Sequence, residues 1–338
     1  MAKRTFCVVI PAFNEEKVIA SSLRSMKKIF KTQDIYVVSD GSKDKTVSIA
    51  RSKGVNVMAL RQNGGKAVAL RKLITSRNLT ERYRYVLFSD ADSRLEQNFL
   101  LEIKKVIKLK PALAVGTVIS DKKGLISAFR TYEYGVTHLV YKNAQNGIKT
   151  ITVAPGCASL YRSDALTKLD LSGRTMTEDF DLTIQIHQKK LGDVIYAPKA
   201  LVVTQDPMTI RDYWRQIVRW DTGTWQNIVE HKLYKPNNKF NLEMYFLTID
   251  NFLWLATIIF TILHPNLFPL FLLSTILTIA VFATLIAFLQ RKLWILLYCP
   301  LFPLFIFLNI SAYYYSLSRV LFSDRKSFLW QKVKRYSA

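Results

Sequence analysis

Two aspartates separated by a single residue, Asp90 and Asp92, have a spacing that suggests chemistry. They follow an apolar run that ends at Phe88, so the sequence predicts two carboxylates on one loop after a buried strand. Mg²⁺ and Mn²⁺ prefer oxygen ligands and usually share carboxylates with substrate phosphates. The alternative is an ordinary polar turn, because aspartate also favours turns.

Asp40 and Lys66 are further candidates for contacts with a nucleotide. Asp40 follows another predicted strand and could bind a base or a ribose through hydrogen bonds. A turn or a helix cap is the alternative, since both favour an aspartate at such a position. Lys66 follows Gly64 and Gly65 near a predicted helix start, where a lysine could contact a diphosphate. A solvated lysine in a loop is the alternative.

An acidic pair, Glu178 and Asp179, opens a predicted helix. Acids are favoured in a first helical turn by the helix dipole, which would explain the pair without any chemistry. The functional interpretation is a general base that takes the proton of an acceptor hydroxyl during attack.

A third group of candidates lies on one face of a predicted helix, because Arg219 and Trp220 follow Gln216 by three and four residues. An amide, a guanidinium and an indole together could bind a phosphate and stack on a sugar ring. Alternatively, the tryptophan and arginine anchor the helix at a membrane interface, where both residue types are common.

The elements that must position these residues alternate between strands and helices, which predicts a doubly wound, mostly parallel sheet. Predicted strands cover residues 6–10, 35–39, 55–60 and 85–88. Ligands of such sheets bind at the carboxyl ends of the strands, where Asn14, Asp40, Asp90 and Asp92 all fall. Asn14 is also expected to cap the helix that follows it.

The net charge of +23 calls for an explanation, such as an anionic partner. Nucleic acid, the anionic face of a membrane and nucleotide diphosphates are the candidates. Because long apolar segments are present, the positive-inside rule accounts for much of the excess, and we expect no nucleic-acid partner. The three cysteines are far apart, form no metal-ligand spacing and suit a reducing compartment. The N-terminus lacks the apolar core of an export signal, so we expect the globular part in the cytosol.

Three apolar stretches near the C-terminus, 242–263, 267–289 and 293–317, are long enough to span a bilayer. The first contains Glu243, Asp250 and Asn251, and Pro300 and Pro303 are expected to break the third. Three full crossings would place the basic tail outside, so we expect one stretch not to cross fully. Either the first lies at the interface, given its acids, or the third is re-entrant at its prolines. The predicted division is a catalytic domain over 1–205, an amphipathic interface region over 206–240, a membrane region over 241–321 and a basic cytosolic tail over 322–338.

Taken together, the motifs VVIPAFNEE, DGSKDKT, NGGKA, DADS, TED and QIVRW resemble those of family 2 glycosyltransferases. The order is most similar to that of processive membrane synthases of poly-N-acetylglucosamine, chitin, hyaluronan and cellulose. The resemblance implies an α/β fold of the GT-A type, with a Rossmann-like, mostly parallel sheet flanked by helices. A C-terminal α-helical membrane region would follow it.

The resemblance also implies a role for each candidate residue. The catalytic base would be Asp179, and Asp92 would bind the Mg²⁺ or Mn²⁺ on the donor diphosphate. The residues that would contact the donor are Pro11, Asn14, Glu15, Asp40, Lys66, Asp90, Gln216 and Arg219. Those on the acceptor side would be Gly156, Glu178 and Trp220.

The implied reaction is transfer from a UDP-sugar with inversion, and UDP-N-acetylglucosamine is favoured over UDP-glucose. The acceptor would be a growing β-linked polysaccharide, or alternatively a lipid such as a polyprenyl phosphate or a glycolipid. The small membrane region suggests an accessory membrane subunit or a homo-oligomer for export. The expected location is a multi-pass protein of the cell membrane, with its catalytic domain in the cytosol. The alternative from another functional class is a membrane scaffold without catalytic activity.

Overall fold

The computed structural model describes residues 3–120, 122–322 and 336, which form two compact units. The first unit holds described residues 3–119, 142–205 and 336, and the second holds 120, 122–141 and 206–322. Most of the predicted basic tail lies outside the described residues.

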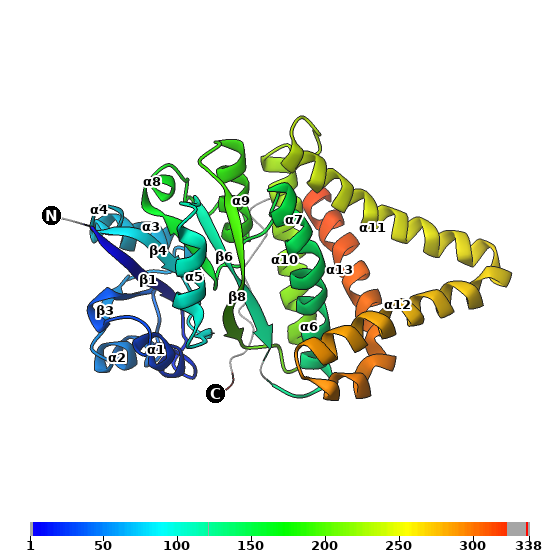
Figure 1. Cartoon of the computed structure of the whole chain (residues 1–338), viewed down its shortest axis with the longest axis horizontal. Coiled ribbons are helices and arrows are strands. Elements are labelled where there is room, and N and C mark those ends of the chain that lie inside the picture. Colours follow the sequence, from blue (N-terminus) through cyan, green and yellow to red (C-terminus); the bar gives the residue numbers. More distant parts are fainter. Residues whose placement is uncertain (1–2, 121, 323–335, 337–338) are drawn as a thin grey trace. The chain divides into compact units, whose positions relative to one another are not determined.

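One sheet forms the centre of the first unit (Figure 1). Its described strands are β1 (Arg4–Ala12), β2 (Ile35–Ser39), β3 (Asn56–Ala59), β4 (Tyr83–Phe88), β5 (Arg94–Leu95), β6 (Leu113–Ser120), β7 (Ser159–Arg162) and β8 (Val194–Thr204). Their spatial order is β3-β2-β1-β4-β7-β6-β8-β5. The strands β3, β2, β1 and β4 run parallel, whereas β7 pairs antiparallel with both β4 and β6, and β5 pairs antiparallel with β8.

The parallel pairing brings the predicted loops to one edge of the sheet. Ala12 pairs with Ser39, and Val9 pairs with Phe88, so the chain leaves β1, β2 and β4 at neighbouring points. Such strands are buried on both faces and therefore read as continuous apolar runs rather than alternating ones. The predicted fold class is confirmed, and the antiparallel pairs extend the sheet beyond β4.

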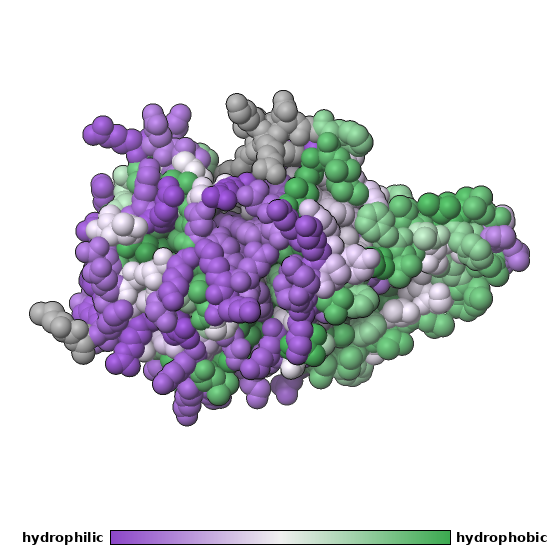
Figure 2. Space-filling view, turned by 90° about the horizontal axis from the view of Figure 1, so that it is seen from above, coloured by the Kyte–Doolittle hydropathy of each residue, from purple (hydrophilic) through white to green (hydrophobic). Residues whose placement is uncertain are grey.

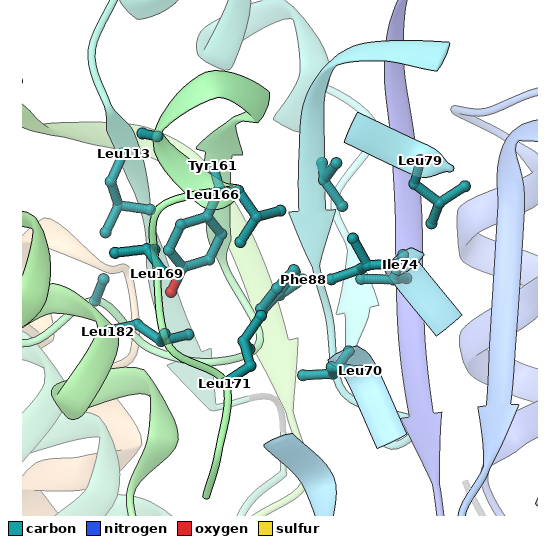
Figure 3. Close-up of a cluster of buried hydrophobic side chains, with 14 of the residues drawn as sticks. Leu70, Ile74, Leu79, Phe88, Leu113, Tyr161, Leu166, Leu169, Leu171 and Leu182 are labelled. Atoms are coloured by element: carbon teal, nitrogen blue, oxygen red, sulfur yellow. The ribbon is translucent and has the colours of Figure 1, made fainter. Parts of the chain in front are cut away.

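Helices cover the sheet of the first unit. They are α1 (Ile19–Lys27), α2 (Thr46–Ser52), α3 (Lys66–Ser76), α4 (Leu79–Arg82), α5 (Phe99–Ile107), α7 (Lys142–Ile148), α8 (Ser163–Leu166) and α9 (Glu178–Gln188), with a 3₁₀ turn η1 (Thr32–Asp34). Helix α3 packs on β1 and β2, and its Leu70 enters a buried cluster with Phe88 and Tyr161 (Figure 3). The rings of Phe88 and Tyr161 lie 4.6 Å apart between centroids.

The prediction that Asn14 caps the first helix is wrong. Helix α1 begins at Ile19 with Val18 at the cap position. Asn14 instead adopts a left-handed backbone conformation with φ of 54°, which asparagine tolerates better than most residues. Its side-chain carbonyl accepts a hydrogen bond from the backbone N–H of Lys43 at 2.8 Å, so it joins the loop after β1 to the loop after β2.

The described part of the second unit is helical. It contains α6 (Leu125–Val136), a π-helical turn η2 (Thr137–Tyr141), α10 (Ile210–Glu230), α11 (Lys239–Leu263), a 3₁₀ turn η3 (Pro265–Leu267), α12 (Phe268–Leu289), a 3₁₀ helix η4 (Leu293–Leu301) and α13 (Phe302–Phe322). An aromatic cluster joins α6, α10 and α13, in which the rings of Phe129 and Phe305 stack 4.8 Å apart.

Three helical segments among the described residues are long and apolar enough to cross a membrane. They cover Lys239–Leu263, Pro265–Leu289 and Leu293–Phe322. Their exposed surface is largely hydrophobic over α11 and α12, as the green area of Figure 2 shows. The predicted break in the third segment is present, because the chain runs as a 3₁₀ helix that contains Pro300 and becomes α-helical at Phe302.

The core of the first unit predicts a large effect of truncating Leu70, which is fully buried. We expect Leu70→Ala to reduce the free energy of unfolding by about 2–5 kcal/mol, because it removes apolar contacts and leaves a cavity. Thermal unfolding of the purified protein measures the loss. Leu101→Ala is the matched control, since Leu101 on α5 is 57% exposed and should leave Tm almost unchanged. Equal effects of both changes would contradict the assigned core.

Candidate active site

The loop after β1 is tied to the loop after β2 by short hydrogen bonds. Pro11 lies near the end of β1, and the backbone N–H of Asn14 donates to the Ser42 hydroxyl at 3.0 Å. Glu15 is 5% exposed, and its backbone N–H donates to the Thr46 hydroxyl at 2.7 Å. These three predicted donor-binding residues therefore share one braced segment at the edge of the sheet.

Asp40 supports the glycine pair that precedes α3. Its two carboxylate oxygens accept hydrogen bonds from the backbone N–H groups of Gly64 and Gly65, each at 2.8 Å. Hydrogen bonds to a carboxylate are stronger than bonds between neutral groups, so Asp40 fixes the entry of the chain into α3. Asp40 is 4% exposed. This structural role was not predicted from the sequence, where only a nucleotide contact, a turn or a helix cap was considered.

Lys66, the first residue of α3, lies at the centre of a cluster of carboxylates. Its ammonium pairs with the Asp90 carboxylate at 2.7 Å and with the Glu178 carboxylate at 2.6 Å. Burial acts to lower the pKa of Lys66, but the carboxylates of Asp90, Glu178 and Asp179 together raise it well above its ordinary value. The lysine is therefore a permanent cation that joins the loop after β4 to the start of α9.

Asp179 is the half-buried acid of this cluster. Its two oxygens accept backbone hydrogen bonds from Gly156 at 3.0 Å and from Phe180 at 2.9 Å. Burial raises the pKa of Asp179 to about 6, and the neighbouring Glu178 carboxylate adds to the rise. Lys66 and the two hydrogen bonds act in the opposite direction. The result is a carboxylate that is ionised near neutral pH but is more basic than an exposed aspartate.

Gly156 fits this place because it has no side chain. A Cβ atom at Gly156 would lie 2.8 Å from the Lys66 nitrogen, 3.3 Å from a Glu178 oxygen and 3.5 Å from an Asp179 oxygen. The cluster therefore closes around the glycine backbone. The structure brings Gly156, Glu178, Asp179, Lys66 and Asp90 together, although these residues are spread over four separate segments of the sequence.

Asp92 follows Asp90 on the loop after β4 and is half-buried. Among the described residues, no group of three or more His, Cys, Asp and Glu side chains could hold a metal ion by itself. The oxygen donors of this loop nevertheless suit Mg²⁺ or Mn²⁺, because such ions commonly bind through one or two carboxylates and complete their shell with water and substrate phosphates.

Gln216, Arg219 and Trp220 lie on α10 in the second unit. The Gln216 side-chain carbonyl accepts a 2.6 Å hydrogen bond from Arg130 of α6. The guanidinium carbon of Arg130 lies 4.7 Å from the centre of the Trp220 ring, within the range of a cation–π contact. Arg219 is half-buried on the same helix.

Two charged residues of α6 were missed in the sequence. Arg130 is 2% exposed, pairs with Glu133 at 2.7 Å and also lies 4.4 Å from the centre of the Tyr213 ring. Glu133 accepts a 2.5 Å hydrogen bond from the Asn309 amide on α13. The sequence did carry a signal for them: Arg130 and Glu133 lie three residues apart in a helix of largely apolar residues.

Lys142, at the start of α7 in the first unit, was also missed. It is 5% exposed, and its ammonium donates to the Val153 carbonyl. Burial lowers the pKa of Lys142 to about 8, against the influence of Asp179. Because Val153 begins the segment that leads to Gly156, this contact fixes the approach of that segment to Asp179.

The sheet, the acidic loop after β4 and the half-buried aspartate at the start of α9 define a glycosyltransferase of the GT-A type. The chain belongs to glycosyltransferase family 2, since the model of the family described as "Glycosyltransferase like family 2" matches residues 3–223. The resemblance found in the sequence is thereby confirmed.

Among the similar proteins are two staphylococcal enzymes and one archaeal structure. The poly-β-1,6-N-acetyl-D-glucosamine synthase of Staphylococcus epidermidis is 26% identical over 224 residues, which are 64% of this chain and 53% of the synthase. The synthase of the same name from Staphylococcus aureus is 25% identical over 224 residues, and this match also covers 64% of this chain and 53% of the synthase. The match thus spans about half the length of these relatives.

A mannosyltransferase from Pyrobaculum calidifontis, solved in complex with GDP-Man and Mn²⁺, resembles the chain in fold with a TM-score of 0.62. The two proteins are 15% identical, and the likeness covers 95% of this chain and 88% of the mannosyltransferase.

The packing at Gly156 predicts that a single added methyl group impairs activity. In Gly156→Ala the Cβ would lie 2.8 Å from the Lys66 nitrogen, so the flexible end of this lysine must move relative to its carboxylates, and we expect a loss of rate of up to about 10²-fold. Steady-state sugar transfer measures the loss. Gly147→Ala is the control, because a Cβ at Gly147 meets nothing within 4 Å. Full activity of Gly156→Ala would contradict the assigned geometry.

The environment of Asp179 predicts the acidic limb of the pH–rate profile. If the ionised carboxylate is required, kcat/KM rises as the pH increases through about 6 and falls below it. Removing the Glu178 charge in Glu178→Gln lowers the pKa of Asp179, so the limb moves to lower pH. Asp193→Asn, a surface change beside Lys149, should leave the limb in place. A limb that does not move in Glu178→Gln would exclude Asp179 as its source.

Proposed function

We propose that this chain is an inverting glycosyltransferase that uses a UDP-sugar to extend a β-linked polysaccharide at a membrane. UDP-N-acetylglucosamine is the favoured donor, followed by UDP-glucose. The observation that carries the proposal is the half-buried Asp179, whose carboxylate is held by the Gly156 and Phe180 amides and has a pKa raised to about 6. The similarity to poly-β-1,6-N-acetyl-D-glucosamine synthases supports the polymer product and the donor.

In this proposal Asp179 is the general base. The acceptor hydroxyl attacks the anomeric carbon of the donor sugar while its proton moves to the Asp179 carboxylate. A bond forms between that oxygen and the carbon as the bond to the UDP diphosphate breaks, so the configuration inverts. The two backbone hydrogen bonds fix the orientation of the carboxylate, and Glu178 beside it would contact the acceptor sugar.

Lys66 and Asp90 would lie beside the donor, with Asp40 near its base or ribose and Pro11, Asn14 and Glu15 along the nucleotide. The Lys66 ammonium already pairs with carboxylates, so a diphosphate oxygen would exchange for one of them rather than meet an unpaired charge. Asp92 would hold Mg²⁺ or Mn²⁺, which supplies positive charge to the leaving diphosphate. Gln216 and Arg219 would bind the donor diphosphate, and Trp220 the acceptor sugar.

The membrane part of the proposal rests on three segments of spanning length and composition. It places a multi-pass protein in the cell membrane, with a cytosolic catalytic domain over 1–205 and an interface region over 206–240. Export of a polymer through this membrane region would require an accessory subunit or a homo-oligomer. The second candidate function is the transfer of one sugar to a lipid acceptor. Membership of an enzyme family and the clustered carboxylates argue against the third alternative, a non-catalytic scaffold.

A panel of radiolabelled UDP-sugars with Mg²⁺ or Mn²⁺ tests the function. We expect membranes that contain the protein to form a polymer from one donor, and linkage-specific hydrolases then identify it. Asp179→Asn should reduce transfer by about 10²–10⁴-fold, the usual contribution of a general base, and leave donor binding largely intact. Asp170→Asn, which changes a surface pair with Arg174, is the control. Undiminished turnover in Asp179→Asn would overturn the assignment of Asp179 as the general base. A lipid that carries a single sugar as the product would overturn the proposal of a polysaccharide product.

A further inference from the structure

The chain between α7 and Gly156 is a segment without a helix or strand of its own, residues 151–156. Most of it is buried, including Ile151, Thr152 and Ala154. Buried backbone groups outside regular secondary structure need hydrogen-bond partners of another kind, because leaving them unpaired is costly. In the 151–156 segment, side chains of α7 and α9 supply these partners, and all of them belong to the first unit.

Helix α9 bonds this segment through a row of three side chains. They are four residues apart on α9 and therefore share one face of the helix. Their bonds join Asp179 to the Gly156 amide at 3.0 Å, Thr183 to the Ala154 amide at 3.2 Å, and His187 to the Ile151 carbonyl at 2.9 Å. The 151–156 segment thus runs antiparallel to α9 and ends at the carboxylate of the proposed base.

Helix α7 bonds the same segment through two side chains. The Gln145 side-chain oxygen accepts a 3.4 Å hydrogen bond from the Thr152 amide, and the Lys142 ammonium donates to the Val153 carbonyl. Lys142 is 5% exposed, so water competes little for its bond. Because hydrogen bonds from a charged donor are stronger than those between neutral groups, Lys142 is the main attachment of the segment to α7.

The charge of Lys142 is not required for a bond to a carbonyl. A neutral donor would satisfy the Val153 carbonyl without the cost of placing an ammonium in a buried position. Burial lowers the pKa of Lys142 to about 8, and the Asp179 carboxylate opposes this shift. The attraction between two opposite charges is mutual, so the ammonium in turn favours the ionised form of Asp179.

Lys142 is charged over the pH range in which Asp179 titrates, because its pKa of about 8 lies above the pKa of about 6 of Asp179. The other groups that act on Asp179 come from three elements. Glu178 of α9 raises the pKa of Asp179, and Lys66 of α3 lowers it. Tyr161 of β7 stays neutral, since burial raises its own pKa far above the physiological range.

We propose that Lys142 is a positioning residue for sugar transfer, which holds the Gly156 amide against Asp179 and keeps that carboxylate ionised. The inference rests on the proposed function, in which Asp179 is the general base. It gives a part in the reaction to a lysine that lies outside all the motifs of the sequence. Lys142 acts through Asp179 and the 151–156 segment rather than through contact with a substrate.

Lys142→Met tests the inference, since it removes the charge and the donor but keeps a long side chain. We expect kcat to fall by about tenfold or more, because the orientation of the carboxylate is loosened. The Kd for the UDP-sugar should stay unchanged. The acidic limb of kcat/KM should move to higher pH, since the ionised form of Asp179 loses a favourable charge. This direction is opposite to that expected for Glu178→Gln.

Two further variants separate the charge of Lys142 from its packing. Lys142→Gln keeps a donor without a charge, so its acidic limb should move as in Lys142→Met. Lys142→Arg keeps the charge, so its limb should stay where the wild-type protein has it. Lys149→Met is the matched control, because the Lys149 side chain is 69% exposed and pairs with Asp193 at the surface. Near-UV circular dichroism and Tm verify that each variant is folded.

Three results would overturn the inference. The first is a limb in Lys142→Met that coincides with that of Lys149→Met, and the second is an equal displacement of the limb in all three Lys142 variants. The third is a loss of UDP-sugar binding in Lys142→Met as large as the loss of transfer, which would indicate a purely structural role.

The proposed function fails in a different way. Transfer that is abolished in Asp179→Asn but normal in Lys142→Met would keep the proposed function and reject the role of Lys142. Undiminished transfer in Asp179→Asn would reject the base and the role of Lys142 together.

Discussion

The ion cluster around Lys66 is the constraint on which the candidate active site depends. Three carboxylates converge here, one from the loop after β4 and two from the first turn of α9, and without a central cation their mutual repulsion would drive them apart or protonate them. The lysine pairs directly with Asp90 and Glu178, and its charge limits the rise in the pKa of Asp179. One ammonium thereby holds these carboxylates together and keeps the half-buried Asp179 ionised near neutral pH.

The sheet and the location of the acids could be predicted because both follow from local rules. Parallel strands buried on both faces read as apolar runs, and their carboxyl ends meet at one edge. The contacts within the site could not be predicted in the same way. Asp40 holds two backbone amides 24 and 25 residues away, and Arg130 reaches Gln216 across 86 residues. Neither distance leaves a periodic signal. The cap assigned to Asn14 failed because the left-handed backbone there delays the helix.

The second unit shows how an apolar composition can conceal polar function. In the sequence, the acids of the first apolar stretch made it one of two candidates for the stretch that does not cross fully. In the structure Asp250 and Asn251 line a cavity with Trp220 and Glu133, and this placement does not depend on whether α11 crosses a bilayer. The number of crossings thus stays a prediction, while the acids have a physical explanation that does not depend on it. The same helix α10 that carries the glutamine, arginine and tryptophan motif forms one wall of this space.

The hydrogen bonds from Gly64 and Gly65 to Asp40 have a consequence for protein engineering. Both carboxylate oxygens are committed to the backbone that leads directly into Lys66. In the proposed function Asp40 also lies near the nucleotide base or ribose, so replacing it to accommodate a different base would release that turn and move the Lys66 ammonium. Donor preference and catalytic rate are therefore not independent design variables at this position. A library intended to change the nucleotide should keep Asp40 fixed and vary the surrounding positions, such as Pro11 and Asn14.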